Sequence, residues 1–433
     1  MTEPGGARLP EQGALPRLRL RRAGGFLDLP WELSLCDWPA SPGFRVLPVG
    51  PSRHLVRFLV VDGDLIALKE EPADVAEREY GVLSHLERVG LPAVTPVGVA
   101  VQPSLGSAIL VTEYLASSLQ FRRLLSRFPM GPGPYRDRLL DAMAWLLVDL
   151  HRGGVYWGDC SLANTLFRRD GARIQAFMVD AETSEVHAAL SDGQRAHDLE
   201  ILVENVGFGL ADVAALQGRP EDLDAAVEGA ESVRERYEAI WRELHLEPRL
   251  STLDRHAIRS QIRRLNELGF AVDEIEIVPT DGGSAVKLRV ATTNRDFHAK
   301  ELERLAGLHV LEGQARMLLN DLHEYVAWLE LSRGRKVTPE EGARRWRREV
   351  LNPALRRLRP AIGSRDPIQA YCDVLEHKWL LSEKAGRDVG LDAAINAYLA
   401  EGAPAPELPP PDLPIMESVT DELPALPVDD LVE

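Results

Sequence analysis

The stretch from His151 to Asp180 reads HRGGVYWGDCSLANTLFRRDGARIQAFMVD. It contains Asp159, then Asn164 five residues further on, and it ends at Asp180 after an apolar run. Residues typical of strands stand on both sides of Asp170-Gly171, and such a dipeptide favours a tight turn. The sequence therefore predicts a loop that carries Asp159 and Asn164, followed by a β-hairpin that ends at Asp180.

Two acids and an amide in this order suit phosphoryl transfer to a hydroxyl group. In that reaction one Asp orients the hydroxyl and accepts its proton, while an Asn and a second Asp hold the metal ions that bridge the ATP phosphates. Asp159 is the candidate for the first role, and Asn164 and Asp180 are the candidate metal ligands. Because an Asp followed by Asn at this spacing is common by chance, the interpretation depends on further motifs upstream.

These residues resemble the catalytic loop and the metal-binding Asp of the protein-kinase-like superfamily. The resemblance extends to its lipopolysaccharide kinase (Kdo/WaaP-type), RIO and aminoglycoside phosphotransferase branches, in which Gly commonly precedes the catalytic Asp, as Gly158 does here. Most of the chain also resembles an uncharacterised bacterial family that carries an extra C-terminal domain of unknown function. The resemblance implies a two-lobed fold that uses ATP and Mg²⁺, and it supplies no substrate.

The upstream half contains the elements that this resemblance requires. Strand-like segments between residues 44 and 69 end at Lys69, which is the candidate contact to the ATP phosphates. An apolar stripe at helical spacing predicts a helix at 74–89, in which Glu79 is the candidate partner of that lysine. Glu77 lies roughly 200° away around such a helix, so the two acids cannot both face Lys69. The alternative is an ordinary lysine at the end of a strand.

Two further predictions concern the walls of the nucleotide site. Gly50 and Ser52 lie in the loop between the first two strands, where backbone N–H groups can cradle phosphate, although Pro51 has no N–H to offer. The strand-like segment 108–115 ends in Glu113-Tyr114-Leu115, where a kinase offers backbone groups to the adenine. The alternative for this segment is a plain buried strand.

Two residues next to these motifs have structural interpretations. Asp198 is expected to begin a helix at 199–210, either as a simple N-cap or as a link back to the catalytic loop. Cys160 follows the candidate catalytic Asp and is expected to anchor its loop by packing, with a reactive thiol as the alternative.

Composition limits the classes of function. The net charge of −17 over 433 residues argues against a general nucleic-acid-binding role. Three cysteines without metal-binding spacing cannot form a disulfide framework, which favours a reducing, cytoplasmic location. No apolar run is long enough to span a bilayer, and Pro4, Gly5 and Gly6 do not suit a signal peptide.

The predicted fold class is α+β, with a two-lobed kinase-like fold followed by a smaller α+β domain of helix-hairpin-helix order. The predicted parts are a flexible basic arm at 1–24, an N-lobe at 25–115, a C-lobe at 116–250, a C-terminal domain of unknown role at 251–402, and a disordered, acidic, Pro-rich tail at 403–433.

The sequence thus predicts an ATP- and Mg²⁺-dependent kinase whose acceptor is a sugar, a lipopolysaccharide-like compound or another small molecule rather than a protein. Ala181-Glu182 stands where protein kinases have Phe-Gly, so no activation-loop switch is expected. The alternative is a pseudokinase that senses nucleotide or acts as a scaffold. The arginine-rich segment Arg344–Arg359 is a candidate site for an anionic partner, with a solvated helix as the preferred interpretation.

Overall fold

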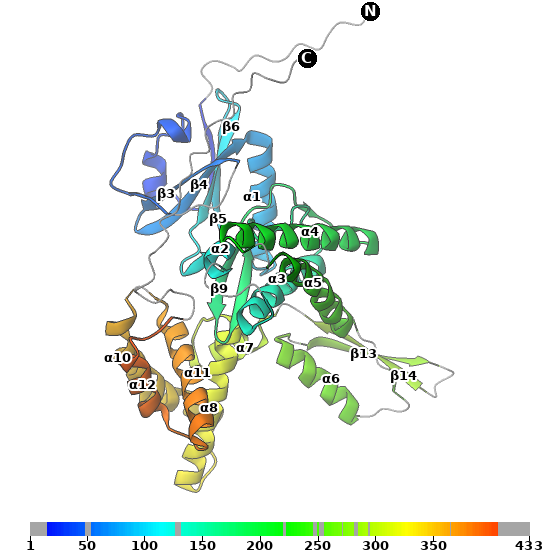
Figure 1. Cartoon of the computed structure of the whole chain (residues 1–433), viewed down its shortest axis with the longest axis vertical. Helices are drawn as coiled ribbons and strands as arrows, with labels where there is room; N and C mark the ends of the chain where they lie inside the picture. Colours follow the sequence, from blue (N-terminus) through cyan, green and yellow to red (C-terminus); the bar gives the residue numbers. More distant parts are fainter. Residues whose placement is uncertain are drawn as a thin grey trace, which may run out of the picture.

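The structure, a computed structural model, describes residues 15–47, 53–125, 131–219, 222–245, 249–250, 255–270, 272–280, 285–292, 295–363 and 365–405. These residues form two lobes and a further, mainly helical part that adjoins the second lobe (Figure 1). Gly50 and Ser52 lie outside the described residues. The same holds for the first 14 residues of the predicted arm and for the predicted tail beyond residue 405.

The described part of the N-lobe is a six-stranded antiparallel sheet in the order β1-β5-β6-β4-β3-β2, with one helix against it. Its elements are β1 (Arg17–Leu20), β2 (Phe44–Arg45), β3 (Leu55–Val61), β4 (Asp64–Pro72), α1 (Ala73–Arg88), β5 (Pro96–Gln102) and β6 (Ser107–Glu113). Alternate residues of the strands face opposite sides of the sheet. One side packs against α1, and the other packs against Trp31 and Trp38 of the segment between β1 and β2.

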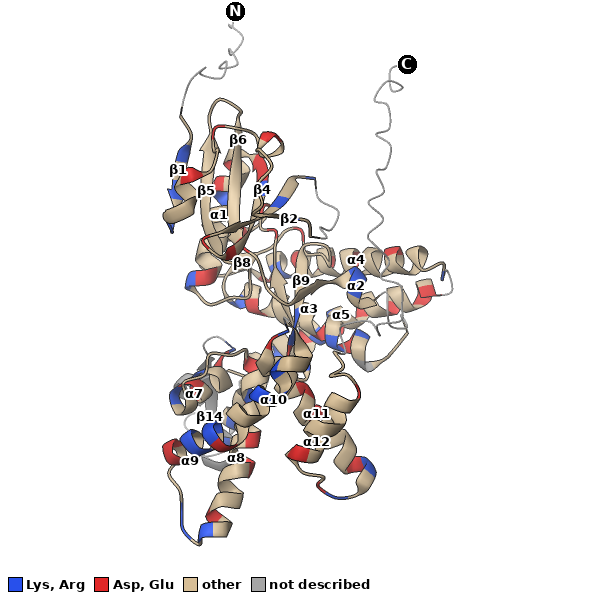
Figure 2. Cartoon of the chain, turned by 90° about the vertical axis from the view of Figure 1, so that its left-hand side faces the viewer, with Lys and Arg blue, Asp and Glu red and all other residues tan. Residues whose placement is uncertain are grey.

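Strand β1 corrects the prediction of a flexible arm. Arg17–Leu20 pair with β5, so these residues belong to the sheet. Arg17 lies 2.7 Å from Glu77, and Arg21 pairs with Glu87. In Figure 2 the basic strand accordingly lies beside acidic residues of the same lobe. The arm prediction was therefore wrong for residues 17–20, because their backbone pairs with β5 as the edge strand of the sheet.

The C-lobe is built around helix α3. Its described elements are β7 (Ser118–Gln120), α2 (Phe121–Leu125), α3 (Pro134–Arg152), β8 (Val155–Tyr156), β9 (Thr165–Asp170), β10 (Arg173–Met178), β11 (Glu185–Val186), α4 (Asp192–Leu216) and α5 (Leu223–Leu244). Leu140, Leu147 and Leu150 of α3 are completely buried in the core that α4 and α5 complete. The antiparallel pair β9–β10 is the hairpin that the sequence predicts.

The remaining elements follow the predicted helix-hairpin-helix order. They are β12 (Arg249–Leu250), α6 (Arg255–Leu268), β13 (Val272–Thr280), β14 (Ala285–Thr292), α7 (Phe297–Ala306), α8 (Glu312–Arg333), α9 (Pro339–Trp346), a π-helical turn (Arg347–Leu351), α10 (Asn352–Ile362), α11 (Pro367–Ala385) and α12 (Leu391–Ala400). Leu265 and Phe270 pack into the C-lobe core, whereas α7 to α12 share a second core around Trp346 and Tyr371. The cores therefore separate after α6, not at the predicted boundary of 250/251.

The tip of the β9–β10 hairpin docks on the helical part. The buried carboxylate of Asp170 accepts hydrogen bonds from the backbone N–H groups of Gly313 and Gln314, both at 2.8 Å. The side chain of Gln369 bonds the N–H and the carbonyl of Gly171, each at 2.9 Å. A Cβ at Gly313 would stand 2.3 Å from the Asp170 carbonyl oxygen, so the close approach requires glycine there.

The arginine-rich segment lies on α9, the π-helical turn and α10. Arg345 contacts Glu341 at 3.1 Å, and Arg357 contacts Asp392 at 2.6 Å. Figure 2 shows basic and acidic residues next to each other at α9. Part of the arginine charge is therefore neutralised within the domain. Within the described ranges, no helix combines the length and the apolarity that crossing a bilayer would require.

Candidate active site

A cavity of about 610 Å³ lies between the two lobes. Its lining includes four of the predicted polar residues, namely Lys69, Asp159, Asn164 and Asp180, together with Glu113-Tyr114-Leu115. This volume is typical of sites for small molecules and cofactors. Residues from three separate segments of the sequence thus line one cavity.

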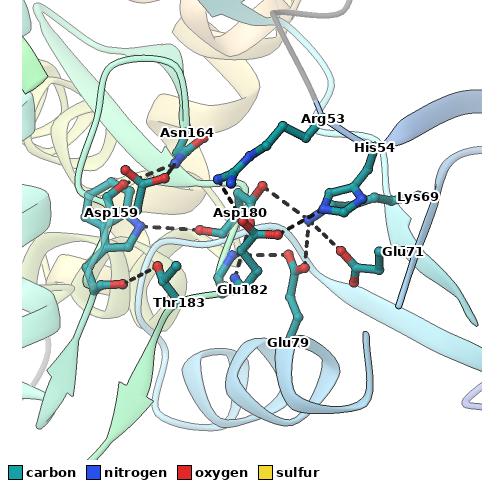
Figure 3. Close-up of polar contacts among 12 residues, drawn as sticks. Arg53, His54, Lys69, Glu71, Glu79, Asp159, Asn164, Asp180, Glu182 and Thr183 are labelled. Carbon is teal, nitrogen blue, oxygen red and sulfur yellow. Dashed lines mark hydrogen bonds and ion pairs between the residues drawn. The ribbon is translucent and has the colours of Figure 1, made fainter. Parts of the chain in front are cut away.

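Lys69 lies at the centre of a group of carboxylates (Figure 3). Its Nζ is 2.8 Å from Glu79 of α1, 2.9 Å from Glu71 of the same strand and 3.2 Å from Asp180. The other oxygen of Glu79 accepts the backbone N–H of Ala181 at 3.1 Å. The structure thus brings together the predicted Lys69–Glu79 pair, and Glu79 also holds the segment that carries Asp180.

The group contains more negative than positive charge. Burial lowers the pKa of Lys69, but the carboxylates of Glu79, Asp180 and Glu71 outweigh it, so the net pKa is raised and the ammonium stays charged. Burial raises the pKa of Glu79, and Asp180 and Glu71 add to the rise while Lys69 opposes it. Because one ammonium faces three carboxylates, the site favours an additional cation.

Asp159 is held in the loop that follows β8. The Nδ2 group of Asn164 donates to Asp159 Oδ2 at 2.9 Å and to its backbone carbonyl at 3.1 Å. Asn205 of α4 donates to the carbonyl of Cys160 at 3.0 Å and lies 3.4 Å from Asp159 Oδ1. Two amides therefore fix the orientation of the candidate catalytic carboxylate.

Asp198 supports the same loop from below. It is completely buried, and its carboxylate accepts the backbone N–H groups of Trp157 and Gly158 at 2.8 Å and contacts His151 at 3.0 Å. Burial by itself raises the pKa of Asp198, but hydrogen bonds from His151, Cys160 and Trp157 bring the pKa below its usual value. Burial raises the pKa of the Cys160 thiol well above normal, so this cysteine packs and is not a reactive thiolate.

The expected capping role of Asp198 is wrong. Helix α4 begins at Asp192, and Ser191 is its N-cap with a capping box formed to Gln194. Asp198 lies inside the helix, where its own N–H needs no cap, and its side chain points to the catalytic loop. Of the two interpretations, N-cap or link to the catalytic loop, the structure shows the link to the loop.

The backbone N–H groups of Glu113, Tyr114 and Leu115 are not equally available to a ligand. The N–H of Glu113 donates to the carbonyl of Thr95 at 2.8 Å, and the N–H of Tyr114 donates to that of Leu65 at 3.0 Å. The N–H of Leu115 has no acceptor among the described residues. Of these three N–H groups, that of Leu115 is the one available to a ligand.

Sequence reasoning assigned no role to three residues of this region. Glu182, noted as a departure from Phe-Gly, contacts both Arg53 and His54 at 3.1 Å. Glu71 was missed because it lies beside Lys69 in an ordinary strand pattern. Asn205 stands seven residues after Asp198, which is two turns along one helix face, and this spacing is the signal that could have found it.

The two lobes and this arrangement of side chains define a kinase-like phosphotransferase. In agreement, residues 64–218 match the model of the lipopolysaccharide kinase (Kdo/WaaP) family, and residues 239–402 match that of a domain of unknown function, DUF4032. The chain therefore contains a part similar to the Kdo/WaaP kinase family, followed by a part similar to a domain of unknown function. Both parts of the resemblance inferred from the sequence are confirmed.

Other comparisons give weaker likenesses. A search of curated proteins found no match. The solved structure of WaaP in complex with acyl carrier protein shares 20% identity, with a TM-score of 0.30, over 45% of this chain and 90% of that chain. The yeast RNA polymerase II CTD kinase complex CTDK-1 shares 16% identity, with a TM-score of 0.27, over 37% of this chain and 52% of that chain. With both TM-scores below 0.5, the interpretation rests on the family matches and the site geometry.

Proposed function

We propose that this protein transfers the γ-phosphoryl group of ATP to a hydroxyl group, with Mg²⁺ as the metal ion. The observation that carries this proposal is the meeting of Lys69, Asp159, Asn164 and Asp180 in one cavity of about 610 Å³. Phosphoryl transfer depends mainly on positioning and on charge stabilisation, and these residue types supply both.

The donor set fits Mg²⁺. This ion prefers oxygen ligands, and Asn164 and Asp180 both offer oxygens at the cavity wall. Because Asn164 turns its Nδ2 group to Asp159, its Oδ1 is left without a hydrogen-bond donor among the described residues. We assign Asn164 and Asp180 as the residues that would hold the ion. When bound, Mg²⁺ would neutralise negative charge on the phosphates.

The remaining residues have separate roles in the proposal. Lys69 contacts the phosphates and Glu79 orients it, as their 2.8 Å contact supports. Asp159 orients the acceptor hydroxyl and takes up its proton at a carboxylate oxygen. The N–H of Leu115 donates to the adenine ring. The three free cysteines agree with the cytosol as the compartment that we propose.

For the acceptor we propose a sugar, a lipopolysaccharide-like compound or another small molecule. The match of residues 64–218 to a lipopolysaccharide kinase family supports this class. A pseudokinase that binds nucleotide as a sensor or scaffold is the second candidate. The ion pair between Arg53 and Glu182 favours this candidate, because both residues line the cavity and their contact occupies part of its wall. The two candidates share their nucleotide contacts and differ in turnover.

Nucleotide binding at this site can be tested by thermal unfolding with and without Mg²⁺-ATP. A ligand at 100 times its Kd stabilises a protein by about 2.7 kcal/mol, so the wild type should show a clear rise in Tm. We expect Asp180→Ala to lose the Mg²⁺-dependent rise. Leu115→Pro, which lacks the N–H, should weaken ATP binding by roughly three- to tenfold, whereas Leu115→Ala should not. An equal rise in Asp180→Ala would place the nucleotide elsewhere.

A further inference from the structure

Three side chains, two of which line the cavity, form a group of metal-binding type that the proposed reaction does not use. His54, Glu71 and Glu182 each offer one ligand atom, and these atoms lie within 4.8 Å of one another. They come from separate elements: His54 immediately precedes β3, Glu71 is near the end of β4, and Glu182 follows Asp180. In Figure 3 His54 and Glu71 lie on the side of the Lys69 ammonium away from Asp159, and Glu182 lies next to Asp180.

Glu71 is the member whose surroundings require a cation. The residue is 3% exposed, and neither of its carboxylate oxygens accepts a hydrogen bond from any described residue. Lys69 lies 2.9 Å from Oε2, but the same ammonium also serves Glu79 and Asp180. Because a buried carboxylate that shares its cation with two other acids is costly, this side chain favours a further positive ligand.

The other two members complete a chemically suitable set. His54 Nε2 lies 3.1 Å from Glu182 Oε2, so two ligand atoms already stand at the separation they would have on one ion. Ligands about 2.1 Å from a tetrahedral Zn²⁺ are roughly 3.4 Å apart. Because the ligand atom of Glu71 lies at most 4.8 Å from the other two, it needs to move by about 1.5 Å or less to join them on one ion. Imidazole suits zinc and other transition metals, and carboxylate suits manganese, so the mixed set selects against Mg²⁺.

We propose that His54, Glu71 and Glu182 bind one divalent transition-metal ion of the Mn²⁺ or Zn²⁺ type, at a site separate from Asn164 and Asp180. The ion joins strands β3 and β4 of the N-lobe to the segment that follows Asp180. It therefore holds Lys69 and Asp180 in a fixed relation across the lobes. This gives a role to Glu182, which stands where protein kinases have the Gly of Phe-Gly. The proposal does not depend on phosphoryl transfer.

The test measures Mn²⁺ binding to the full chain without nucleotide, by electron paramagnetic resonance of the free ion after removal of metals with a chelator. His54→Ala and Glu182→Gln should each weaken the binding of one ion by at least about tenfold. His187→Ala is the matched control, because His187 lies 3.2 Å from Glu185 in a similar His–Glu pair outside the group. Circular dichroism confirms that each variant is folded.

A second set of variants separates this site from the proposed catalytic ligands. Asp180→Asn should retain one bound Mn²⁺, and the double variant His54→Ala, Asp180→Asn should lose it. Titration with Zn²⁺ in competition with Mn²⁺ should displace the ion, whereas Mg²⁺ at the same concentration should not. The proposal is overturned if the wild type binds no Mn²⁺ in the submillimolar range, if His54→Ala binds it unchanged, or if Asp180→Asn alone abolishes binding.

Discussion

His151 and Asp198 show how residues outside the cavity shape the catalytic loop. Both are buried beneath it, and Nδ1 of His151 also lies 2.6 Å from the hydroxyl of Tyr237. Asp198 fixes the backbone on the N-terminal side of Asp159, and the histidine fixes Asp198 in turn. The position of the candidate catalytic carboxylate therefore depends on a hydrogen-bonded chain that reaches α5.

This buried pair predicts a pH dependence of stability. Burial lowers the pKa of His151 from its ordinary 6.5, and the opposing effect of Asp198 is smaller. As the pH falls below about 6.5, the unfolded chain takes up a proton before the folded chain does, so the free energy of unfolding decreases. His151→Gln should remove this part of the decrease, measured by urea unfolding between pH 5 and 8. The exposed residue His309 supplies the control, and His309→Gln should keep the wild-type slope. A wild-type slope in His151→Gln would contradict the assignment.

The sequence predicts some site residues better than others, and the difference is physical. Lys69 and Glu79 could be paired because a strand end and a helix face have fixed directions. Glu71 could not be recognised, since its burial depends on how α1 and the segment after Asp180 close over β4. The site thus follows from sequence where local periodicity sets the direction of a side chain. The site does not follow from sequence where segments that are distant in the chain create the environment of a side chain.

The β9–β10 hairpin links the candidate metal ligands to the C-terminal part. Asn164 immediately precedes β9 and Asp180 follows β10, while the turn between the strands is held by α8 and α11. The sequence predicts this hairpin from alternation and from Asp170-Gly171. It does not predict the docking, because the hydrogen bonds of Asp170 join residues more than 140 positions apart. The pairing of β1 with the distant β5 was missed for the same reason.

The docking of the hairpin should be measurable as stability. Asp170→Asn leaves the size of the side chain unchanged but brings an N–H₂ group to a place where two backbone N–H groups need acceptors. We expect a loss of about 1–3 kcal/mol in the free energy of unfolding, measured by urea denaturation. Asp192→Asn, at a carboxylate whose side chain is 98% exposed, should change it little. Equal effects of the two substitutions would show that the docking contacts add no net stability.

The described residues form three hydrophobic cores, and the hairpin tip connects the two larger ones. The first runs through both lobes and includes the end of α6, and the second belongs to α7 to α12. The pattern of helices and strands predicted an α+β chain of several parts, but the division after α6 depends on where Leu265 and Phe270 pack, which the sequence pattern does not fix. Because the second core reaches the hairpin that ends at the candidate metal ligands, the C-terminal part is placed to influence the cavity.

The central claim is that Asp159 and its neighbours transfer a phosphoryl group. It is tested most directly by following loss of the γ-phosphate from labelled Mg²⁺-ATP, with a mixture of sugars and lipopolysaccharide as acceptors, in the wild type and in Asp159→Asn. The account predicts Mg²⁺-dependent loss in the wild type and a rate lower by roughly 10²- to 10⁴-fold in a variant that still binds Mg²⁺-ATP. A wild type that binds Mg²⁺-ATP but turns over no faster than Asp159→Asn would contradict the account. The nucleotide-binding scaffold would then be the remaining candidate function.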